Sequence, residues 1–272
     1  YAIAGTTYNF TGTTPGSTVS VGAPGAERTI TNVAAGRISG GSTDAINGSQ
    51  LYAATQAIDA LNTSVVANAI HYYSVNDGGT QQSNYANNSA TGVNSVASGP
   101  GTLAAGVGSV AMGHNSQVQS GTGAVAIGEG QTVNGDGAVA IGDPNTVSGT
   151  GAVGMGANNT VNGNGAVALG NGNNAQGVGS VALGNASSAL AAGAVAFGNA
   201  ATANNANDVA LGSGSTTTAA VGTANTVING TTYAFAGTNP TSTVSVGSVG
   251  AERTVTNVAA GRISGSSTDA IN

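Results

Sequence analysis

The sequence holds few residues that could do chemistry, and they are scattered. Its 272 residues include two His, ten acidic residues and no Cys. His71 and His114 are far apart, and no Cys could complete a zinc site with either of them. Glu129, Asp136 and Asp143 are single acids in predicted turns, whereas calcium-binding β-rolls repeat an acidic residue about every nine positions. We expect no metal site, no cofactor and no enzymatic activity, because neither a Ser-His-Asp nor a paired-carboxylate arrangement can be assembled.

One glycine pattern has the spacing of a dinucleotide-binding loop. Residues 149–154 read G-T-G-A-V-G, which satisfies G-x-G-x-x-G. Such a loop works between a strand and a helix of a βαβ unit, where the helix N-terminus binds the pyrophosphate. The sequence after Gly154 predicts neither the helix nor the βαβ unit. We interpret the pattern as a coincidence of the repeat described below.

The charged residues are few, and all the basic ones lie in the two copies of a module described below. They make up 5% of the chain, the net charge is −6, and all four basic residues are Arg. With no basic stripe to neutralise phosphates, nucleic acid is excluded as a partner. Each Arg has an acid close by, so inter-chain salt bridges are predicted, with solvated surface charges as the alternative. Exposed pairs stabilise by only about 0–1 kcal/mol, so their role would be alignment. The predicted pairs involve Glu27, Arg28, Arg37, Asp44, Glu252, Arg253, Arg262 and Asp269.

A five-residue phrase dominates the chain. It is typified by residues 124–128, A-V-A-I-G, and occurs nine times between residues 95 and 212. Its valines are spaced by 14, by 15 and then six times by 14 residues. A period this regular predicts stacked structural units. The valines are Val96, Val110, Val125, Val139, Val153, Val167, Val181, Val195 and Val209.

Each repeat predicts two short strands and two turns. Val125 and Ile127 alternate with alanines, as side chains do on the two faces of a strand, and Gly128 ends the strand. Val133 marks a second short strand, and glycine-rich turns join the two. Each repeat is therefore one rung of a β-solenoid, and nine rungs about 4.8 Å apart give a column roughly 43 Å tall.

The first strand of each rung is apolar on both faces, which requires a further layer on each side. No other part of the chain offers nine rungs, so we expect another copy of the chain to supply the cover. The bulky column is predicted to form the core of this oligomer: Val125, Ile127, Val139, Ile141, Val153, Met155, Val167, Leu169, Val181 and Leu183. The amides of the turns and second strands are expected to face outward: Asn158, Asn159, Asn162, Asn164, Asn171, Asn173 and Asn174.

A module occurs on both sides of the repeats. Residues 5–47 recur at 230–272 with a constant offset of 225. In the first copy, alternation over residues 18–21 and 28–31 predicts two strands, joined by a turn at Pro24-Gly25.

The first copy is followed by a predicted helix over residues 45–69, with Thr43 or Asp44 as its N-cap. Its apolar residues follow spacings of 3 and 4, which is a heptad seam. Asn68 at the end of the seam is either a register device of a coiled coil or lies beyond the helix. Residues 71–76 then predict a strand, and a polar loop follows. The seam comprises Leu51, Ala54, Ile58, Leu61, Val65 and Asn68.

The composition excludes two alternatives. Gly is abundant, at 46 residues, but does not occupy every third position, so the chain is not collagen. The mean hydropathy of +0.10 and the strict apolar period contradict plain disorder. The absence of Cys fits an exported protein. With no run of 18 apolar residues and no signal peptide, we expect a soluble protein or a piece of a longer one.

Repeat and module together resemble the trimeric autotransporter adhesins, the YadA-like surface proteins of Gram-negative bacteria. The 14-residue phrase is similar to their head repeats, and residues 33–38 with 44–51 look like their neck. Residues 71–76 resemble the lead-in to such a head. Residues 8–31 are similar to the short β-prism modules that precede necks, without the Trp that some of them carry.

The resemblance implies a mainly β homotrimer: a left-handed parallel β-roll head, β-prism and neck modules, and a short trimeric coiled coil. It also implies display at the bacterial cell surface, an outer-membrane anchor outside this sequence, and adhesion to host cell-surface or extracellular-matrix proteins. The expected segments are a β-prism-like module (1–31), a neck (32–52), a coiled-coil helix (53–70), a head lead-in (71–94), the head (95–212), a second β-prism-like module (213–256) and the start of a second neck (257–272).

Two functions remain open from the sequence. The head could bind a host partner through its outward turns, or it could be a passive spacer that holds another tip away from the membrane. A third reading, ice or mineral binding, has only a single Thr column in its favour, and Asn174 interrupts that column.

Overall fold

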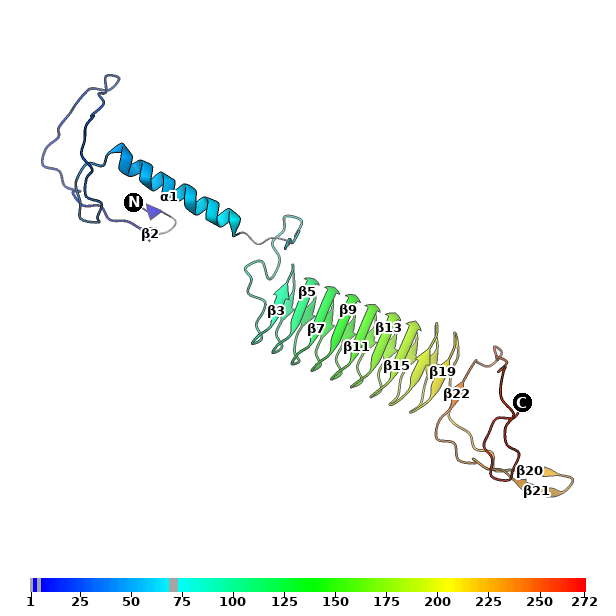
Figure 1. Cartoon of the computed structure of the whole chain (residues 1–272). Helices are drawn as coiled ribbons and strands as arrows, with labels where there is room; N and C mark the ends of the chain where they lie inside the picture. The colour runs from blue at the N-terminus through cyan, green and yellow to red at the C-terminus, as the bar shows by residue number, and fades with distance from the viewer. Residues whose placement is uncertain (1, 4–5, 69–72) are drawn as a thin grey trace. The chain divides into compact units, whose positions relative to one another are not determined.

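The structure is a computed structural model that describes residues 2–3, 6–68 and 73–272. Its contacts divide the chain into two units, residues 1–74 and 75–272, and each is described here by itself. The first unit holds the first module and a helix, and the second holds the repeats and the second module (Figure 1). Within the described ranges, no helix is both long and apolar enough to span a bilayer.

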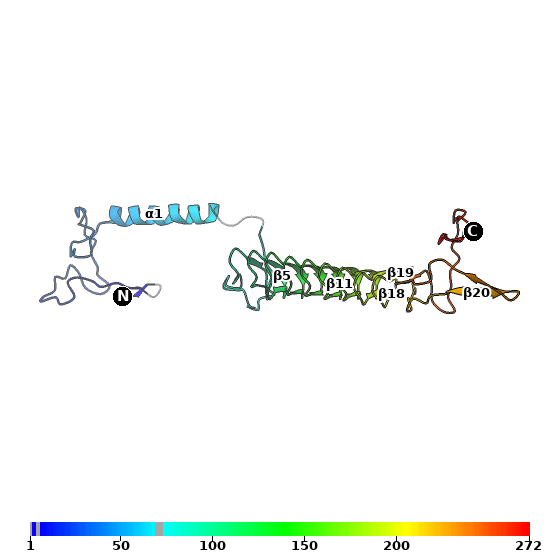
Figure 2. The same cartoon turned by 90° about the horizontal axis from the view of Figure 1, so that it is seen from below.

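The repeats form a parallel β-solenoid, which confirms the predicted stack of rungs. The first strands of all repeats join one parallel sheet in which valine pairs with valine, as Val125 does with Val139. A tenth strand, from the second module, ends this sheet. Figure 2 shows the rungs from below, stacked from β5 to β19. The ten strands are β3 (Val96–Ser98), β5 (Val110–His114), β7 (Val125–Glu129), β9 (Val139–Asp143), β11 (Val153–Ala157), β13 (Val167–Asn171), β15 (Val181–Asn185), β17 (Val195–Phe197), β19 (Val209–Leu211) and β22 (Val244–Ser245).

The predicted second strand of each rung is also confirmed. These two-residue strands form a parallel sheet of eight, in which Val147 pairs with Val133 and Val161. The eight strands are β4 (Leu103–Ala104), β6 (Gln117–Val118), β8 (Thr132–Val133), β10 (Thr146–Val147), β12 (Thr160–Val161), β14 (Asn174–Ala175), β16 (Ser188–Ala189) and β18 (Thr202–Ala203).

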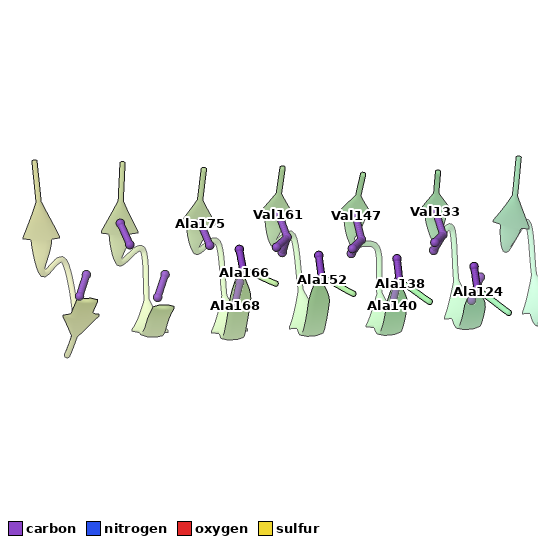
Figure 3. Close-up of a cluster of buried hydrophobic side chains, with 14 of the residues drawn as sticks. Ala124, Val133, Ala138, Ala140, Val147, Ala152, Val161, Ala166, Ala168 and Ala175 are labelled. Atoms are coloured by element: carbon purple, nitrogen blue, oxygen red, sulfur yellow. The ribbon is translucent and has the colours of Figure 1, made fainter. Parts of the chain in front are cut away.

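The core lies between the two sheets and consists of small side chains. Ala124, Ala126 and Val133 are wholly buried there, and Figure 3 shows the alanines of one sheet facing the valines of the other. The spacing leaves no room for larger residues: at Gly154, even a Cβ would lie only 2.8 Å from Cγ2 of Val147. The chain's own second strand therefore covers the alanine face. For this face no further copy is needed, and the bulky column lies outside, where the cover expected from another copy is still required.

A glycine lies within one residue of the end of each first strand, rather than ending it as predicted, and it does so for a steric reason. Gly128 has a φ of 122°, a left-handed backbone that favours glycine, and a Cβ there would lie 2.0 Å from the carbonyl oxygen of Gly142. On the next rung, a Cβ added to the equivalent Gly142 would lie 1.9 Å from the carbonyl oxygen of Gly156. The chain must turn sharply here while the next rung passes directly above, and only glycine meets both conditions.

Polar side chains fill one corner of the core. Gln131, Asn145, Asn159, Asn173 and Ser187 are wholly or almost wholly buried, one per rung. The side-chain nitrogen of Asn159 donates to the side-chain oxygen of Asn145 (2.8 Å) and to the backbone oxygens of the turns. Our expectation that Asn159 and Asn173 face outward was wrong. The strand-end turn directs carbonyl oxygens inward, and each buried carbonyl needs a donor.

The predicted helix is α1 (Gly48–Ala67). Its N-cap is Asn47, not Thr43 or Asp44, because Asn47 and Gln50 form a capping box. The backbone N–H of Gln50 donates to the side-chain oxygen of Asn47, and the backbone N–H of Asn47 donates to the side-chain oxygen of Gln50. Asn68 lies just beyond the helix as its C-cap. No residue of α1 is buried.

The modules contain less strand than their alternation predicts. The first copy has the predicted turn, closed by a bridge between Ala23 and Ala26, but residues 18–21 and 28–31 are extended chain without a partner strand. It also has a short pair, β1 (Ala2–Ile3) and β2 (Thr6–Thr7). The second copy forms a hairpin of β20 (Asn225–Ile228) and β21 (Thr231–Ala234), followed by β22.

The strand predicted over residues 71–76 is not formed by the four of these residues that the structure describes. Residues 71 and 72 lie outside the described residues, and residues 73–76 have no regular secondary structure.

Candidate functional site

The bulky column forms an apolar surface along the outside of the ten-stranded sheet. All ten residues predicted as oligomer core lie on this outer face, half-buried or exposed, because they alternate with the buried alanines. Leu169, Met155 and Phe197 are 38%, 40% and 51% exposed. Apolar side chains thus continue over nine rungs without a covering layer within the described chain. A contiguous apolar surface of this length is typical of an interface.

A polar row runs beside this surface, one residue beyond the strand-end glycines. The row carries His114 on rung two and Glu129 on rung three. Nδ1 of His114 lies 2.8 Å from Oε2 of Glu129. Further along it carries amides, and the side-chain nitrogen of Asn171 donates to the side-chain oxygen of Asn185 at 2.9 Å. Asn185 donates in the same way to Asn199 at 3.0 Å. These side chains are exposed, so the row offers repeated hydrogen-bonding groups to a partner.

The neck arginines are paired within one chain. Nε of Arg37 lies 2.8 Å from Oδ2 of Asp44, and the second copy repeats this with Arg262 and Asp269 at 2.8 Å. In both copies a second guanidinium nitrogen and the Arg backbone amide also donate to the carboxylate. The hydrogen bonds from Arg37 lower the pKa of Asp44. In the single chain these pairs form a clasp across seven residues, and the inter-chain bridges favoured from the sequence stay a prediction.

Glu27 and Glu252 have a different role from the predicted charge pairing. Their Oε1 atoms accept hydrogen bonds from the backbone amides of Gly25 (3.0 Å) and Gly250 (2.9 Å). These bonds, with those from their own amides, lower the pKa of both carboxyl groups. The two glutamates stabilise the module turns and make no ion pair with Arg28 or Arg253 in the described structure.

The last rung contains a buried carboxylate that sequence reasoning missed. Asp208 is wholly buried at the position where the other eight repeats have Ala or Ser. Burial raises the pKa of Asp208, but hydrogen bonds from Thr217, the Thr243 amide and Asn205 outweigh it, so the pKa is lowered. A charged residue in a column of small ones was the signal that could have revealed it.

Arg253 lies at the same end of the solenoid. Its guanidinium donates to Oγ of Ser215 (2.8 Å), to the carbonyl oxygen of Val246 (2.6 Å) and to the carbonyl oxygen of Ser213. Asp208 and Arg253 together attach the second module to the last rung. Elsewhere among the described residues, no group of three or more His, Cys, Asp or Glu side chains gathers as a metal site would require.

The fold and its outer surfaces define a class: a parallel β-solenoid head, preceded in the chain by a neck and a helical segment. Two family models match the chain. The coiled stalk of trimeric autotransporter adhesins matches residues 29–70 and 254–272. The YadA head domain repeat matches residues 90–116, 120–143, 148–173, 175–201 and 192–215. Together they match more than half of the chain, which belongs to the trimeric autotransporter adhesins.

Individual proteins are similar over shorter or more divergent stretches. Autotransporter adhesin BtaE of Brucella suis biovar 1 (strain 1330) is 64% identical over 66 residues, which are 24% of this chain and 9% of BtaE. The collagen-binding domain of Yersinia adhesin YadA is 29% identical, with a TM-score of 0.46 over 65% of this chain and 81% of that one. The C-terminal YadA-like domain of BPSL2063 from Burkholderia pseudomallei is 27% identical, with a TM-score of 0.25 over 90% and 82% of the two chains.

Proposed function

We propose that three copies of this chain associate through the bulky column and form a head that attaches a Gram-negative bacterium to host cells or extracellular matrix. The head comprises residues 95–212, flanked by the module, neck and coiled-coil segments expected from the sequence. It is a surface-exposed part of an outer-membrane protein. Membership of the adhesin family supports a role in binding rather than catalysis.

The observation that carries the proposal is the uncovered bulky column. Fully burying a Val, Leu, Ile or Met side chain stabilises by about 1.5–3 kcal/mol. About half of the surface of these side chains is still exposed on nine rungs, so burying it against other chains would strongly favour association. The helix seam needs a partner for the same reason: Leu51, Ile58 and Leu61 are 67%, 65% and 64% exposed. One association of three chains would cover both surfaces.

Once the bulky column is covered, the polar row and the turns remain to contact a host partner. Apart from His114, Glu129 and Asp143, the row carries small uncharged groups such as Asn171 and Asn185. It has no Trp, Tyr or Arg, so a hot spot of the usual kind is absent from the described row. Weak contacts repeated over rungs and over three chains add up through multivalency. Adhesion is therefore distributed along the head.

Two measurements test this function. Light scattering of the purified chain should give three times the chain mass of 25.5 kDa, and a monomer at micromolar concentration would contradict the architecture. Binding to a panel of matrix proteins, including collagen, should then be saturable. A head with every outward turn Asn of rungs four to seven replaced by Ala is the matched control.

A passive spacer is the second candidate. The duplication of the module on both sides of the head favours it, because such an arrangement can be extended without any contact to a host. A trimer that binds no member of the panel, and whose deletion from the whole protein leaves attachment unchanged, would support the spacer.

A further inference from the structure

Asn-Gly is a dipeptide that can modify itself without an enzyme, and the chain contains six of them. Asparagine is chemically labile, and the glycine after it has no Cβ to hinder its backbone nitrogen. That nitrogen can attack the side-chain amide carbon and displace ammonia, provided that it is accessible to water and makes no hydrogen bond. The fold therefore determines which of the six can react. Their asparagines are Asn47, Asn134, Asn162, Asn164, Asn171 and Asn229.

Backbone hydrogen bonds hold the glycine nitrogen at two of the six. The Gly165 N–H donates to the carbonyl oxygen of Thr150, and the Gly172 N–H donates to that of Ala157, both at 2.8 Å. Each bond joins one rung to the rung before it, so the nitrogen is released only when the two rungs separate locally. Such opening costs free energy that an exposed turn outside the stack does not require. The two asparagines before these glycines are therefore protected, although their side chains are exposed.

Burial or capping protects three more. Gly135 and Gly163 are buried, and a Cβ on them would lie 2.2 Å and 1.9 Å from a carbonyl oxygen of the next rung, which leaves little room for water at their nitrogens. Asn47 is the N-cap of α1. Its side chain donates to the carbonyl oxygen of Val33 (3.0 Å) and accepts from the backbone N–H of Gln50 (3.2 Å). It cannot turn towards the next backbone nitrogen without uncapping the helix.

Asn229 has none of these protections in the part of the chain that the structure describes. With Gly230 it forms the two-residue loop of the β20–β21 hairpin, since Ile228 pairs with Thr231. The φ of Asn229 is 48° and that of Gly230 is 78°, as a type I′ turn requires, and Asn-Gly is a preferred sequence for this turn. Both loop residues are exposed, and no described residue accepts a hydrogen bond from the Gly230 N–H.

We propose that Asn229 and Gly230 form a self-modification site at which water converts the asparagine to isoaspartate or aspartate. The Gly230 nitrogen gives its proton to water or hydroxide and forms a bond to Cγ of Asn229. The bond between Cγ and Nδ2 breaks, and Nδ2 leaves as ammonia with a proton from water. A second water then opens the five-membered imide at either carbonyl, which leaves a carboxylate in place of the amide. No oxidant, metal or enzyme takes part.

The reaction changes the second module and has no equivalent in the first. Isoaspartate adds a backbone carbon to a loop whose length sets the register of the two strands. A hairpin of only two strands is marginally stable by itself, so β20 and β21 separate where isoaspartate forms. The residue equivalent to Asn229 before the first copy is Ala4, which has no side-chain amide to lose.

Ageing of the purified full chain in neutral buffer made with heavy-oxygen water tests the proposal. Each deamidation takes up an oxygen atom from the water, so the mass distinguishes it from any earlier event. After digestion with pepsin in acid, where the reaction is slow, mass spectrometry measures all six sites in one sample. We expect deamidation at Asn229 to be at least about tenfold faster than at Asn164 and Asn171, because those two require local opening. Equal rates at the three sites would overturn the proposal.

The same chain unfolded in urea shows whether the fold causes this difference. We expect all six dipeptides to react within about threefold of one another there, since each has an unhindered glycine nitrogen. The preference for Asn229, if it persisted undiminished in urea, would come from the local sequence and would overturn the role assigned to the fold.

Two variants test the effect on the hairpin, each compared with its own fresh sample. Asn229→Ala, the residue of the first copy, removes the reacting amide. Freshly prepared Asn229→Asp supplies the charge without the extra backbone carbon. Hydrogen exchange of residues 225–234 should become faster as the natural chain ages and should stay constant in Asn229→Ala. Fresh Asn229→Asp should exchange like the fresh natural chain.

Three results would overturn the proposed loss of the turn. The first is a natural chain that keeps its protection after Asn229 has reacted. The second is an equal loss of protection in aged Asn229→Ala, which would assign the change to another cause. The third is exchange in fresh Asn229→Asp as fast as in the aged natural chain, which would assign it to the charge.

Discussion

Asn159 lies one rung beyond Asn145 and donates its side-chain amide to the side-chain oxygen of Asn145 at 2.8 Å. The same amide donates to the carbonyl oxygens of Met155 (3.0 Å) and Gly170 (2.9 Å), so one side chain connects three consecutive rungs. The repetition of this arrangement at Asn173 makes the buried amides a continuous support for the strand-end turns.

The first prediction follows from that ladder. Asn159→Ala leaves two buried carbonyl oxygens without a donor, so it should destabilise the solenoid by about 1–3 kcal/mol per lost buried partner. Asn162→Ala, on an exposed residue of the same rung, is the control and should stay within about 0.5 kcal/mol. The midpoint of urea unfolding compares them, and equal midpoints would show that the ladder contributes nothing.

A second prediction separates two glycines of adjacent rungs, Gly142 and Gly137. Gly142→Ala places a Cβ 1.9 Å from the carbonyl oxygen of Gly156 in a backbone with φ of 125°, so it should destabilise by about 3 kcal/mol or more. At Gly137 the φ is 60° but nothing lies within 4 Å of the added Cβ. Gly137→Ala should therefore cost about 1 kcal/mol, the strain of the left-handed backbone alone. Thermal unfolding distinguishes the two variants, and similar melting temperatures would mean that the rungs can move apart.

A third prediction concerns the bulky column. Ile141 is half-buried on the outer face in a single chain, so Ile141→Asp should leave the solenoid folded. In the proposed trimer the same carboxylate is buried without a partner, which is strongly unfavourable. Light scattering should give the mass of one chain, with the β-sheet circular dichroism retained. Asp143→Asn, at the exposed end of the same strand, should remain trimeric. A trimer of Ile141→Asp would place the interface elsewhere.

A fourth prediction is a pH dependence at Asp208. Its folded-state pKa lies below the ordinary value of 3.8, so the carboxylate stabilises the last rung above pH 3.8. This contribution is lost as the pH falls through the lower folded value. The natural chain should melt above Asp208→Asn at pH 7, and the difference should shrink towards pH 2. A difference that stays constant with pH would show that the charge is unimportant.

The sequence was sufficient to predict the rungs but not the direction of their faces. The period of the valines counts the residues per rung directly, and the Val133 position located the second strand. Both faces of the first strand are apolar, so hydrophobicity could not decide which one turns inward. Volume decides it: the sheets lie so close that even a Cβ at Gly154 would come within 2.8 Å of Cγ2 of Val147, so the column of small residues turns inward.

The polar residues were harder to predict, because their roles depend on backbone groups that a sequence does not display. Asn159 and Asn162 look alike in an amide-rich repeat, yet one is buried under inward-pointing carbonyls and the other is exposed. The neck acids were singled out because each lies close to an Arg, but the sequence did not show that Asp44 binds Arg37 of its own chain. Asp208 was overlooked as one more repeat variant.

The last prediction concerns adhesion itself. The amides of the polar row repeat from Asn171 to Asn199 and are individually weak contacts, since no single one has the desolvated surface of a hot spot. Asn171→Ala should therefore leave matrix binding nearly unchanged, within about twofold. Deleting one, two and then three whole rungs between residues 139 and 180 should lower binding progressively, because each removal takes away contacts from three chains at once. Light scattering must show that each shortened chain is still a trimer. Loss of all binding from one point change would contradict a distributed surface, and unchanged binding after three deleted rungs would identify the head as a spacer.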